Sequence, residues 1–409
     1  MELFKREKYL KQIRAFYHDT EIIKVITGIR RCGKSCLMQT IAEELLANGI
    51  CKDNIFFYNL DKYGFKNIKT SNALEELLFS NKQEGIKYIF IDEIQNVKDF
   101  EPVLEALRLE DDYSIFITGS NSYLLSGELA THLTGRYIQF ELQTLTFDEY
   151  EEMKAFYRRP IDADGIKEFD SFILEGGFPK TIFLDTLSDK QLYVRSVLND
   201  ILVKDIKRRV KIKNIEAFQT VERYVINNFG STTNINNIYC DLNKSGIAIS
   251  RETITKYIKA LVDAKVLSEC SRFDLKSRRS LKNERKYYLA DLSIYFALNT
   301  DNRINYGPVL ENVVYNYAKS MNYNVSVGRI GNFECDFILR NNENDYAYVQ
   351  VALTIMNNKD TEDREYRPLE LIADGYPKYL LTRRDLLQKR SGIKHVDIID
   401  FIRGKKLFN

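Results

Sequence analysis

The chain has 409 residues, of which 44% are hydrophobic and 29% charged, and its formal net charge of +2 suits a cytoplasmic protein of two to four domains. No apolar run approaches the roughly 18 residues that span a bilayer, and the first eight residues lack the apolar core of a signal peptide, so we expect neither a membrane protein nor export. The six cysteines contain no C-x-x-C pair and the three histidines are scattered, which argues against a zinc ribbon, a disulfide framework and a histidine-based metal site.

A glycine-rich loop between a predicted strand and a predicted helix is the strongest signal in the chain. A helix over Arg6–His18 precedes a strand at Ile22–Thr27, and a further helix runs from Lys34 to about Asn48. The residues between strand and helix follow the pattern G-x-x-x-x-G-K-S. With the next helical residue, they are Gly28, Ile29, Arg30, Arg31, Cys32, Gly33, Lys34, Ser35 and Cys36.

The chemistry of this pattern is that of a phosphate cradle. Its glycines permit tight turning and close backbone approach, so the amide N–H groups point inward at an anion. In such a loop, Lys34 reaches the β- and γ-phosphates of a nucleoside triphosphate, and Ser35 ligates Mg²⁺. We therefore predict that this loop binds ATP and Mg²⁺.

The following strands deliver acidic side chains to a sheet edge. A strand at Ile55–Asn59 and an intervening helix are followed by a strand at Tyr88–Asp92, after which comes Glu93. Ligands of parallel sheets bind at the carboxyl ends of the strands. We therefore expect Asp92 to hold the Mg²⁺ and Glu93 to orient or deprotonate the attacking water.

A fourth strand, Ser114–Thr118, follows a helix at Phe100–Leu109 and ends in a polar turn. Ser120 and Asn121 in this turn are either within reach of a γ-phosphate and its attacking water or ordinary turn residues. The regular alternation of strands and helices predicts an α/β fold with a doubly wound parallel sheet.

A fifth strand is predicted at Tyr137–Leu142, and Arg136 leads into it. The order of phosphate loop, acidic strand end, polar turn and arginine resembles the AAA+ ATPases. In that family, an arginine near this place is a finger that completes the site of a neighbouring subunit, so the resemblance implies this catalytic role for Arg136 and a homo-oligomer. The alternative is a solubilising surface arginine.

Two further segments make the resemblance specific to one subfamily. They are Phe140–Tyr150 and Leu174–Pro179. They resemble a widespread prokaryotic subfamily of AAA+ ATPases, similar to archaeal-type ATPases, and this resemblance spans essentially the whole chain. It implies a P-loop ATPase core over residues 1–145 and a separate C-terminal domain with a restriction-endonuclease-like core. The motifs of the C-terminal part specify the family and not a known reaction.

Residues 146–213 have a helical pattern and are expected to form the helical lid that follows the ATPase core. The lid ends in the basic run Lys204–Lys213, which contains six Lys or Arg residues and one Asp. This run is either a solvated helix face or a contact to phosphates.

Residues 214–300 are predicted to form three short helices and a hairpin, a pattern that resembles a winged helix-turn-helix. The hairpin loop Arg272–Lys286 carries seven basic residues and two acids, which favours contact with a DNA backbone. Pure scaffolding or protein docking is the alternative. The candidate nucleic-acid contacts are Arg251, Arg278, Arg279 and Lys282.

Residues 301–409 place Glu311 on a predicted helix, Asp336 on a strand and Gln350 on the next strand. This order resembles the endonuclease-like core, in which an acidic helix residue, a strand Asp and a Glu/Gln-x-Lys assemble Mg²⁺ and a catalytic lysine. Here Gln350 replaces a carboxylate and Ala352 stands at the lysine position. We therefore expect a vestigial α/β site without efficient nuclease activity.

These expectations describe an ATP-hydrolysing AAA+ enzyme whose nucleotide state drives or switches a DNA-associated C-terminal module. Two alternatives remain open. The first is a slow ATPase switch that docks a protein partner without nucleic acid, and the second is a metal-dependent DNA nuclease with an ATPase accessory.

Overall fold

The computed structural model describes residues 2–80, 83–119, 133, 135–207, 210–277, 279–299, 304–341 and 346–409, with the backbone alone for 280–284. The chain forms two compact units, Met1–Leu142 and Gln143–Asn409. Within these residue ranges, no helix has both the length and the apolar character that crossing a membrane requires. Four predicted site residues lie wholly or by their side chain outside the described part: Ser120, Asn121, Arg278 and Lys282.

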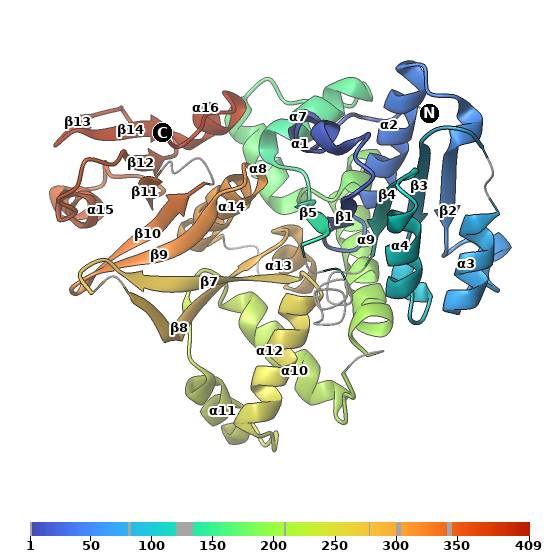
Figure 1. The fold of residues 1–409 in the computed structure, drawn as a ribbon. Coiled ribbons are helices and arrows are strands. Elements are labelled where there is room, and N and C mark those ends of the chain that lie inside the picture. Colours follow the sequence, from blue (N-terminus) through green and yellow to red (C-terminus); the bar gives the residue numbers. More distant parts are fainter. Residues whose placement is uncertain are drawn as a thin grey trace. The chain divides into compact units, whose positions relative to one another are not determined.

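The first unit is built on a five-stranded parallel sheet with the strand order β2-β3-β4-β1-β5 (Figure 1). Every residue of the three central strands is buried, whereas the two edge strands are only partly buried. The central strands are therefore mostly apolar runs, as expected where helices cover both faces of a parallel sheet. The strands are β1 (Ile23–Thr27), β2 (Ile55–Asn59), β3 (Lys87–Asp92), β4 (Tyr113–Thr118) and β5 (Tyr137–Glu141).

The prediction of a parallel α/β sheet is confirmed, and the strand bounds agree with the predicted ones to within one residue. The chain leaves β1, an inner strand, passes to β2 at the far edge of the sheet, returns through β3 and β4, and ends in β5 on the other side of β1. The order of the strands thus reverses at β1, the kind of position where open α/β sheets bind their ligands. The described helices of this unit are α1 (Glu7–Ile13), α2 (Lys34–Ala47), α3 (Ser71–Phe79) and α4 (Glu101–Leu109).

The helix predicted over Arg6–His18 is shorter than expected. It ends at Ile13 and is followed by a 3₁₀ turn over Arg14–Phe16. After this turn, Tyr17 donates a hydrogen bond to Glu44 of α2 over 2.9 Å, and Arg14 pairs with the same carboxylate at 2.7 Å. These contacts to α2 accompany the change from helix to 3₁₀ turn.

The second unit combines helices with a nine-stranded sheet of order β13-β14-β12-β11-β10-β9-β7-β8-β6. Its helices are α7 (Phe147–Phe156), α8 (Gly165–Glu175), α9 (Leu187–Asp200, continued by a π-helix over Ile201–Ile206), α10 (Ile215–Asn227), α11 (Ile235–Lys244), α12 (Arg251–Asp263), α13 (Ser293–Leu298), α14 (Tyr306–Ser320), α15 (Lys359–Glu370) and α16 (Ile398–Arg403). Its strands are β6 (Thr232–Thr233), β7 (Leu267–Asp274), β8 (Arg279–Leu289), β9 (Asn324–Ile330), β10 (Phe333–Arg340), β11 (Tyr346–Val351), β12 (Lys378–Thr382), β13 (Lys389–Arg390) and β14 (Ile393–Asp397).

The segments expected at 214–300 and 301–409 share this one sheet. Strand β7 of the hairpin pairs in parallel with β9, with Arg272 opposite Val327 and Asp274 opposite Arg329. At the tip, the backbone N–H of Leu275 donates to the Arg329 carbonyl over 2.9 Å. The hairpin is therefore continuous with the C-terminal strands, because β9 supplies hydrogen-bond partners to the outer edge of β7.

The segment Leu174–Pro179, which carries part of the family resemblance, has a packing role in this unit. A Cβ atom at Gly177 would lie 2.1 Å from the carbonyl oxygen of Leu145, so no side chain fits there. The backbone N–H of Gly177 donates to the buried Asp291 carboxylate over 2.8 Å. This glycine lets the segment approach the chain around Leu145 closely and anchors it on Asp291.

Candidate nucleotide-binding site

The predicted phosphate loop follows β1 directly and has an unusual backbone. Gly28, Arg31 and Gly33 all adopt positive φ angles, of 145°, 70° and 109°. A Cβ atom at Gly28 would lie 2.2 Å from the carbonyl oxygen of Leu142, which leaves glycine as the residue that fits. The glycines therefore shape a loop whose backbone turns tightly before α2 begins.

Lys34 is the first residue of α2 and is only 7% exposed. Its ammonium donates hydrogen bonds to the carbonyls of Gly28 and Ile29 over 3.0 and 3.2 Å. The positive charge is thus held within the loop, next to the N-terminal end of a 14-residue helix. Both features favour an anion at this place.

The remaining loop residues differ in accessibility. Ser35 and Arg30 are partly buried, Arg31 is exposed and Ile29 is buried. Cys32 is fully buried, and this burial raises the pKa of its thiol, which makes it a neutral spacer within the loop. Cys36 is exposed at the surface, and the pKa of its thiol is raised by partial desolvation and then by the negative charge of Asp92.

Asp92 ends β3 and is held by both neighbouring strands. The amide of Asn59, at the end of β2, donates to one carboxylate oxygen over 2.7 Å. The hydroxyl of Thr118, at the end of β4, donates to the other, and accepts the backbone N–H of Glu93 over 3.1 Å. The sequence interpretation missed the roles of Asn59 and Thr118, although each is a polar residue that ends a predicted strand.

Among the described residues, Asp92 forms no ion pair, because both of its side-chain partners are neutral donors. The residue is 1% exposed, so its carboxylate is buried against neutral donors. Mg²⁺ in nucleotide sites takes one or two oxygen ligands from the protein together with substrate phosphates. The carboxylate of Asp92 and the hydroxyl of Ser35 fit this requirement.

Glu93 follows Asp92 in a left-handed conformation, with φ of 62°. Such backbone strain in a residue other than glycine is typical of functional sites. Its partly buried carboxylate accepts a hydrogen bond from the amide of Gln95. Glu93 thus lies at the same strand end as Asp92.

Arg136 lies at the amino-terminal ends of the strands, whereas the phosphate loop and Asp92 lie at their carboxyl ends. Its carbonyl accepts the backbone N–H of Ile23 over 3.0 Å, at the start of β1, whereas the phosphate loop begins after Thr27 at the end of that strand. The five residues of β1 separate the two places by about 16 Å. The half-exposed guanidinium pairs with Glu105 of α4. The structure therefore does not bring Arg136 into the phosphate loop of its own chain.

The predicted C-terminal residues do come together in the second unit. The backbone N–H of Asp336 donates to the Gln350 side chain over 3.3 Å, and the Gln350 amide donates to Glu365 of α15 over 3.0 Å. Burial raises the pKa of Asp336 well above its ordinary value, and the nearby charge of Glu311 adds to this shift. The sequence interpretation missed Glu365, because nothing in its spacing links it to Gln350.

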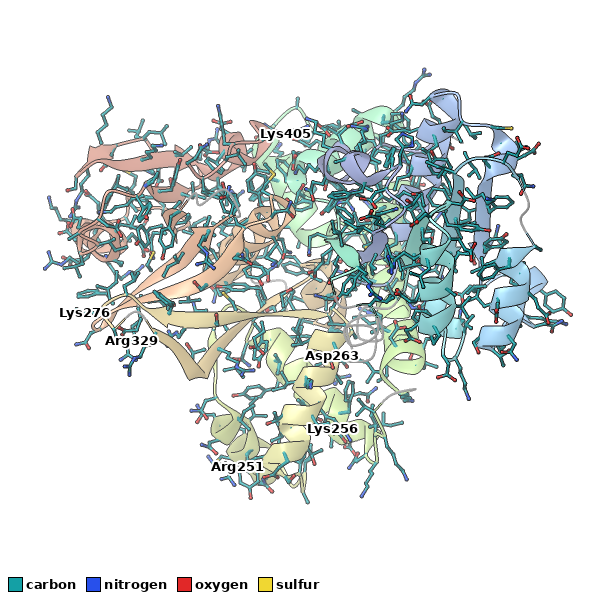
Figure 2. All side chains as sticks on the ribbon, viewed as in Figure 1. Arg251, Lys256, Asp263, Lys276, Arg329 and Lys405 are labelled. Carbon is teal, nitrogen blue, oxygen red and sulfur yellow. The ribbon has the colours of Figure 1, made fainter. Side chains whose placement is uncertain are left out.

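The candidate nucleic-acid contacts lie on α12 and the hairpin. Arg251 begins α12, donates to the side chain of Asn236 over 2.6 Å and stacks 4.0 Å from the ring centre of Tyr239 (Figure 2). Lys256 on the same helix is exposed, as is Arg279 at the start of β8. Positive side chains are thus present on the outer face of α12.

Comparison with known proteins agrees with this geometry. A family model of an AAA domain matches residues 20–151, and a model of a domain of unknown function, DUF8612, matches residues 166–304. The chain is 32% identical over 404 residues to an uncharacterized protein of Haemophilus influenzae, covering 98% of each chain. It is 29% identical over 392 residues to an uncharacterized protein of Methanocaldococcus jannaschii, covering 92% of this chain and 86% of that one.

Among solved structures, the Orc1 protein of Aeropyrum pernix in complex with DNA aligns with 73% of this chain and 93% of its own, at 13% identity and a TM-score of 0.34. A likeness of this size carries no argument about function. The identity to the Haemophilus influenzae protein over nearly all of both chains does show a common family. The chain therefore belongs to the same family as that protein, and the P-loop part of its first unit is an AAA domain.

Proposed function

We propose that the protein binds and hydrolyses ATP at residues 28–36, and that the nucleotide state switches a DNA-contacting module in the second unit. The observation that carries the first part is that a buried lysine in a phosphate loop and a buried carboxylate held by neutral donors lie at the same end of one sheet. Lys34 and Asp92 follow β1 and β3 at the carboxyl edge of one parallel sheet.

In this proposal, Lys34 and the backbone N–H groups of the loop hold the phosphates, and Ser35 and Asp92 hold Mg²⁺. When bound, Mg²⁺ neutralises negative charge on the phosphates. Glu93 orients the attacking water and accepts its proton, for which it must exchange its contact with Gln95 for the water. Ser120 and Asn121 are proposed to contact the γ-phosphate or this water.

Arg136 is proposed to act in trans, on the phosphate loop of a neighbouring subunit. Its place supports this, because the backbone of Arg136 lies at the start of β1, about 16 Å from the phosphate loop at the end of that strand, and its guanidinium pairs with Glu105. Its present partner Glu105 also pairs with Arg108, so Glu105 keeps a cation when Arg136 turns to a neighbour. This role implies a homo-oligomer.

The DNA-contacting module is proposed to be a winged helix formed by residues 215–289. The order of its elements supports this: α10, β6, α11 and α12 are followed by the hairpin of β7 and β8, and β6 pairs with β8. In this fold the third helix enters the major groove. Arg251, Lys256 and Lys259 are exposed on that helix, and Arg278, Arg279 and Lys282 are candidate contacts of the hairpin.

ATP turnover measured with and without double-stranded DNA tests the proposal. We expect turnover in the intact protein, stimulation by DNA, and loss of both in Lys34→Ala. A variant with Arg251, Lys256 and Lys259 changed to alanine serves as the matched control, since it should retain basal turnover and lose the stimulation. Absence of turnover under all conditions contradicts the ATPase assignment.

A second candidate function is a nucleotide switch that docks a protein partner. The pairing of β7 with β9 favours it, because this side of the hairpin is already used inside the second unit. Turnover that does not respond to DNA, in a protein that also fails to bind DNA at low salt, would favour this candidate over the DNA module.

A further inference from the structure

A second group of carboxylates lies far along the chain from the nucleotide site. Glu311 projects from α14, and Glu334 and Asp336 come from β10. The three belong to elements packed together in the second unit, since α14 lies against β8, β9 and β10. Asp336 is 7% exposed, and its carboxylate accepts the backbone N–H of Val351 over 2.8 Å.

The side chain that compensates these carboxylates comes from the hairpin. Lys286 of β8 is 5% exposed, and its ammonium lies 2.6 Å from Glu334 and 3.2 Å from Glu311. Tyr288, two residues further along the same strand, donates its hydroxyl to Glu311 over 2.9 Å. Arg272 of β7 pairs with the other oxygen of Glu334.

We propose that the Lys286 ammonium occupies the place that a divalent cation would take among Glu311, Glu334 and Asp336. The cluster is then a permanent ionic junction between the hairpin and the C-terminal strands, and it takes up no metal. This inference goes beyond the nucleotide site and does not depend on ATP binding. In this proposal, the three carboxylates hold the hairpin through Lys286 and do not bind a metal ion.

The ligand requirements of hard cations support this assignment. Mg²⁺ needs near-octahedral oxygen coordination, with several positions filled by water. Here the ammonium already takes an oxygen of both Glu311 and Glu334, and Gln350 supplies an amide where a carboxylate would add charge. Among the described residues, no group of three His, Cys, Asp or Glu side chains has the arrangement of a metal site.

The ionic junction at Lys286 gives the β7–β8 hairpin a second point of attachment. The tips of the β7–β8 and β9–β10 hairpins lie at the same end of the sheet, where Lys276 and Arg329 are found (Figure 2). Lys286 adds an ionic contact further along β8, towards α14. The hairpin is thereby fixed at both places.

Mn²⁺ binding in the absence of nucleotide tests the proposal in full-length protein. Asp92→Asn serves as the parent, so that the nucleotide site makes no contribution. We expect no Mn²⁺ binding measurable by calorimetry in this parent, and when Lys286→Gln is added we expect measurable binding, with an affinity at least tenfold above the detection limit. Adding Glu311→Gln should remove this binding, and Lys286→Arg should behave as the parent.

Two results would overturn the proposal. One is Mn²⁺ binding by the parent that disappears with Glu311→Gln, because the cluster would then be a metal site with Lys286 in place. The other is a folded Lys286→Gln variant without measurable Mn²⁺ binding. Should Lys286→Gln not fold, Lys286→Met replaces it, since it keeps a long side chain, removes the ammonium and leaves all three carboxylates in place. The same binding is then expected, and its absence contradicts the proposal.

Discussion

Lys34 and Asp92 carry opposite charges at the same buried edge, and each is held by neutral groups. Loop carbonyls hold Lys34, and the side chains of Asn59 and Thr118 hold Asp92. Neutral partners leave both charges available to a bound nucleotide and its cation. At the scale of single residues, this separates the nucleotide site from the C-terminal cluster, where Lys286 already neutralises the carboxylates.

Substitutions of Lys34 and Glu93 should have different effects, one on ATP binding and the other on ATP hydrolysis. Lys34→Ala removes the ammonium that compensates phosphate charge, so we expect nucleotide binding to be abolished or nearly so. Glu93→Gln leaves the cradle and Asp92 in place and removes the base, so ATP should remain bound without hydrolysis. Nucleotide affinity and turnover are measured for both variants. Turnover at the unmodified level in Glu93→Gln would contradict the role of Glu93.

Lys24 of β1 predicts a dependence of stability on pH. Burial lowers the pKa of this lysine to about 7, although its ammonium contacts the Asp19 carbonyl and the Ser114 hydroxyl. Below pH 7 both the folded and the unfolded chain carry the proton. Between pH 7 and about 10 the unfolded chain keeps it and the folded chain releases it, so this lysine makes stability rise with pH, by at most about 1.4 kcal/mol per unit.

Denaturant unfolding of the wild type and Lys24→Met from pH 6 to 9.5 isolates this contribution. The stability of the wild type relative to the variant should rise with pH above 7 and stay constant below it. Other groups titrate in the same range, but they do so in both proteins and cancel in the difference. A difference that is flat over the whole range would show that Lys24 keeps its proton in the folded protein.

At the scale of elements, the parallel register of β1 and β5 decides where Arg136 can act. Ile23 lies opposite Tyr137 and Thr27 opposite Glu141, so the two ends of β1 separate Arg136 from the phosphate loop. A parallel sheet gathers the carboxyl ends of its strands at one edge and the amino ends at the other. A residue that precedes β5 therefore faces away from the site formed by its own chain.

If Arg136 acts in trans, Arg136→Ala should bind ATP normally and lose about 10³-fold in turnover. Mixing this variant with Lys34→Ala should restore part of the activity, since each subunit supplies what the other lacks. Arg108→Ala is the matched control, because Arg108 also pairs with Glu105. Equal losses in Arg108→Ala and Arg136→Ala, without rescue on mixing, would assign Arg136 a structural role.

The exposed face of α12 predicts an electrostatic mode of DNA binding. Changing Arg251, Lys256 and Lys259 together to alanine should lower the slope of log affinity against log salt by up to about three, one for each lost phosphate contact. Changing the exposed lysines Lys62, Lys69 and Lys98 of the first unit controls for net charge. Equal changes in the salt slope for the two triple variants would remove α12 from the proposed interface.

At the scale of the whole molecule, the chain divides after Leu142, and the second unit contains everything that follows. Its nine-stranded sheet unites the hairpin with the C-terminal strands, so the segments expected to form a winged helix and an endonuclease-like core share one sheet. Lys286, Asp336 and Gln350 lie within this sheet and are all less than 10% exposed. A phosphodiester therefore has poor access to them.

We therefore expect no efficient cleavage of linear or supercoiled DNA by the intact protein in the presence of Mg²⁺ or Mn²⁺. The loss of one preorganised charge-stabilising group costs about 10² to 10³ in rate, and Gln350 and Ala352 remove two. Gel analysis with Asp336→Ala as the control checks this. Cleavage that disappears in Asp336→Ala would make the nuclease alternative the leading function.

The sequence by itself determined the five strands of the first unit and pointed to a candidate nucleotide site at their carboxyl ends. Short apolar runs such as Tyr88–Ile91, flanked by polar residues, are typical of buried central strands, and the loop Gly28–Ser35 has a pattern that depends on local backbone chemistry. Both signals lie within a few consecutive residues. They are therefore readable without knowing the contacts between distant segments.

Only the tertiary structure decided the partners of these residues. Asn59 and Thr118 meet Asp92 because β2 and β4 flank β3, an order that no local pattern encodes. Lys286 and Glu311, 25 positions apart, meet only when α14 packs on β8, and β7 joins β9 across some 55 residues of chain. Pairings of this kind depend on how whole elements bury their apolar faces, so the charge that fills a polar cluster cannot be read from the spacing of its residues.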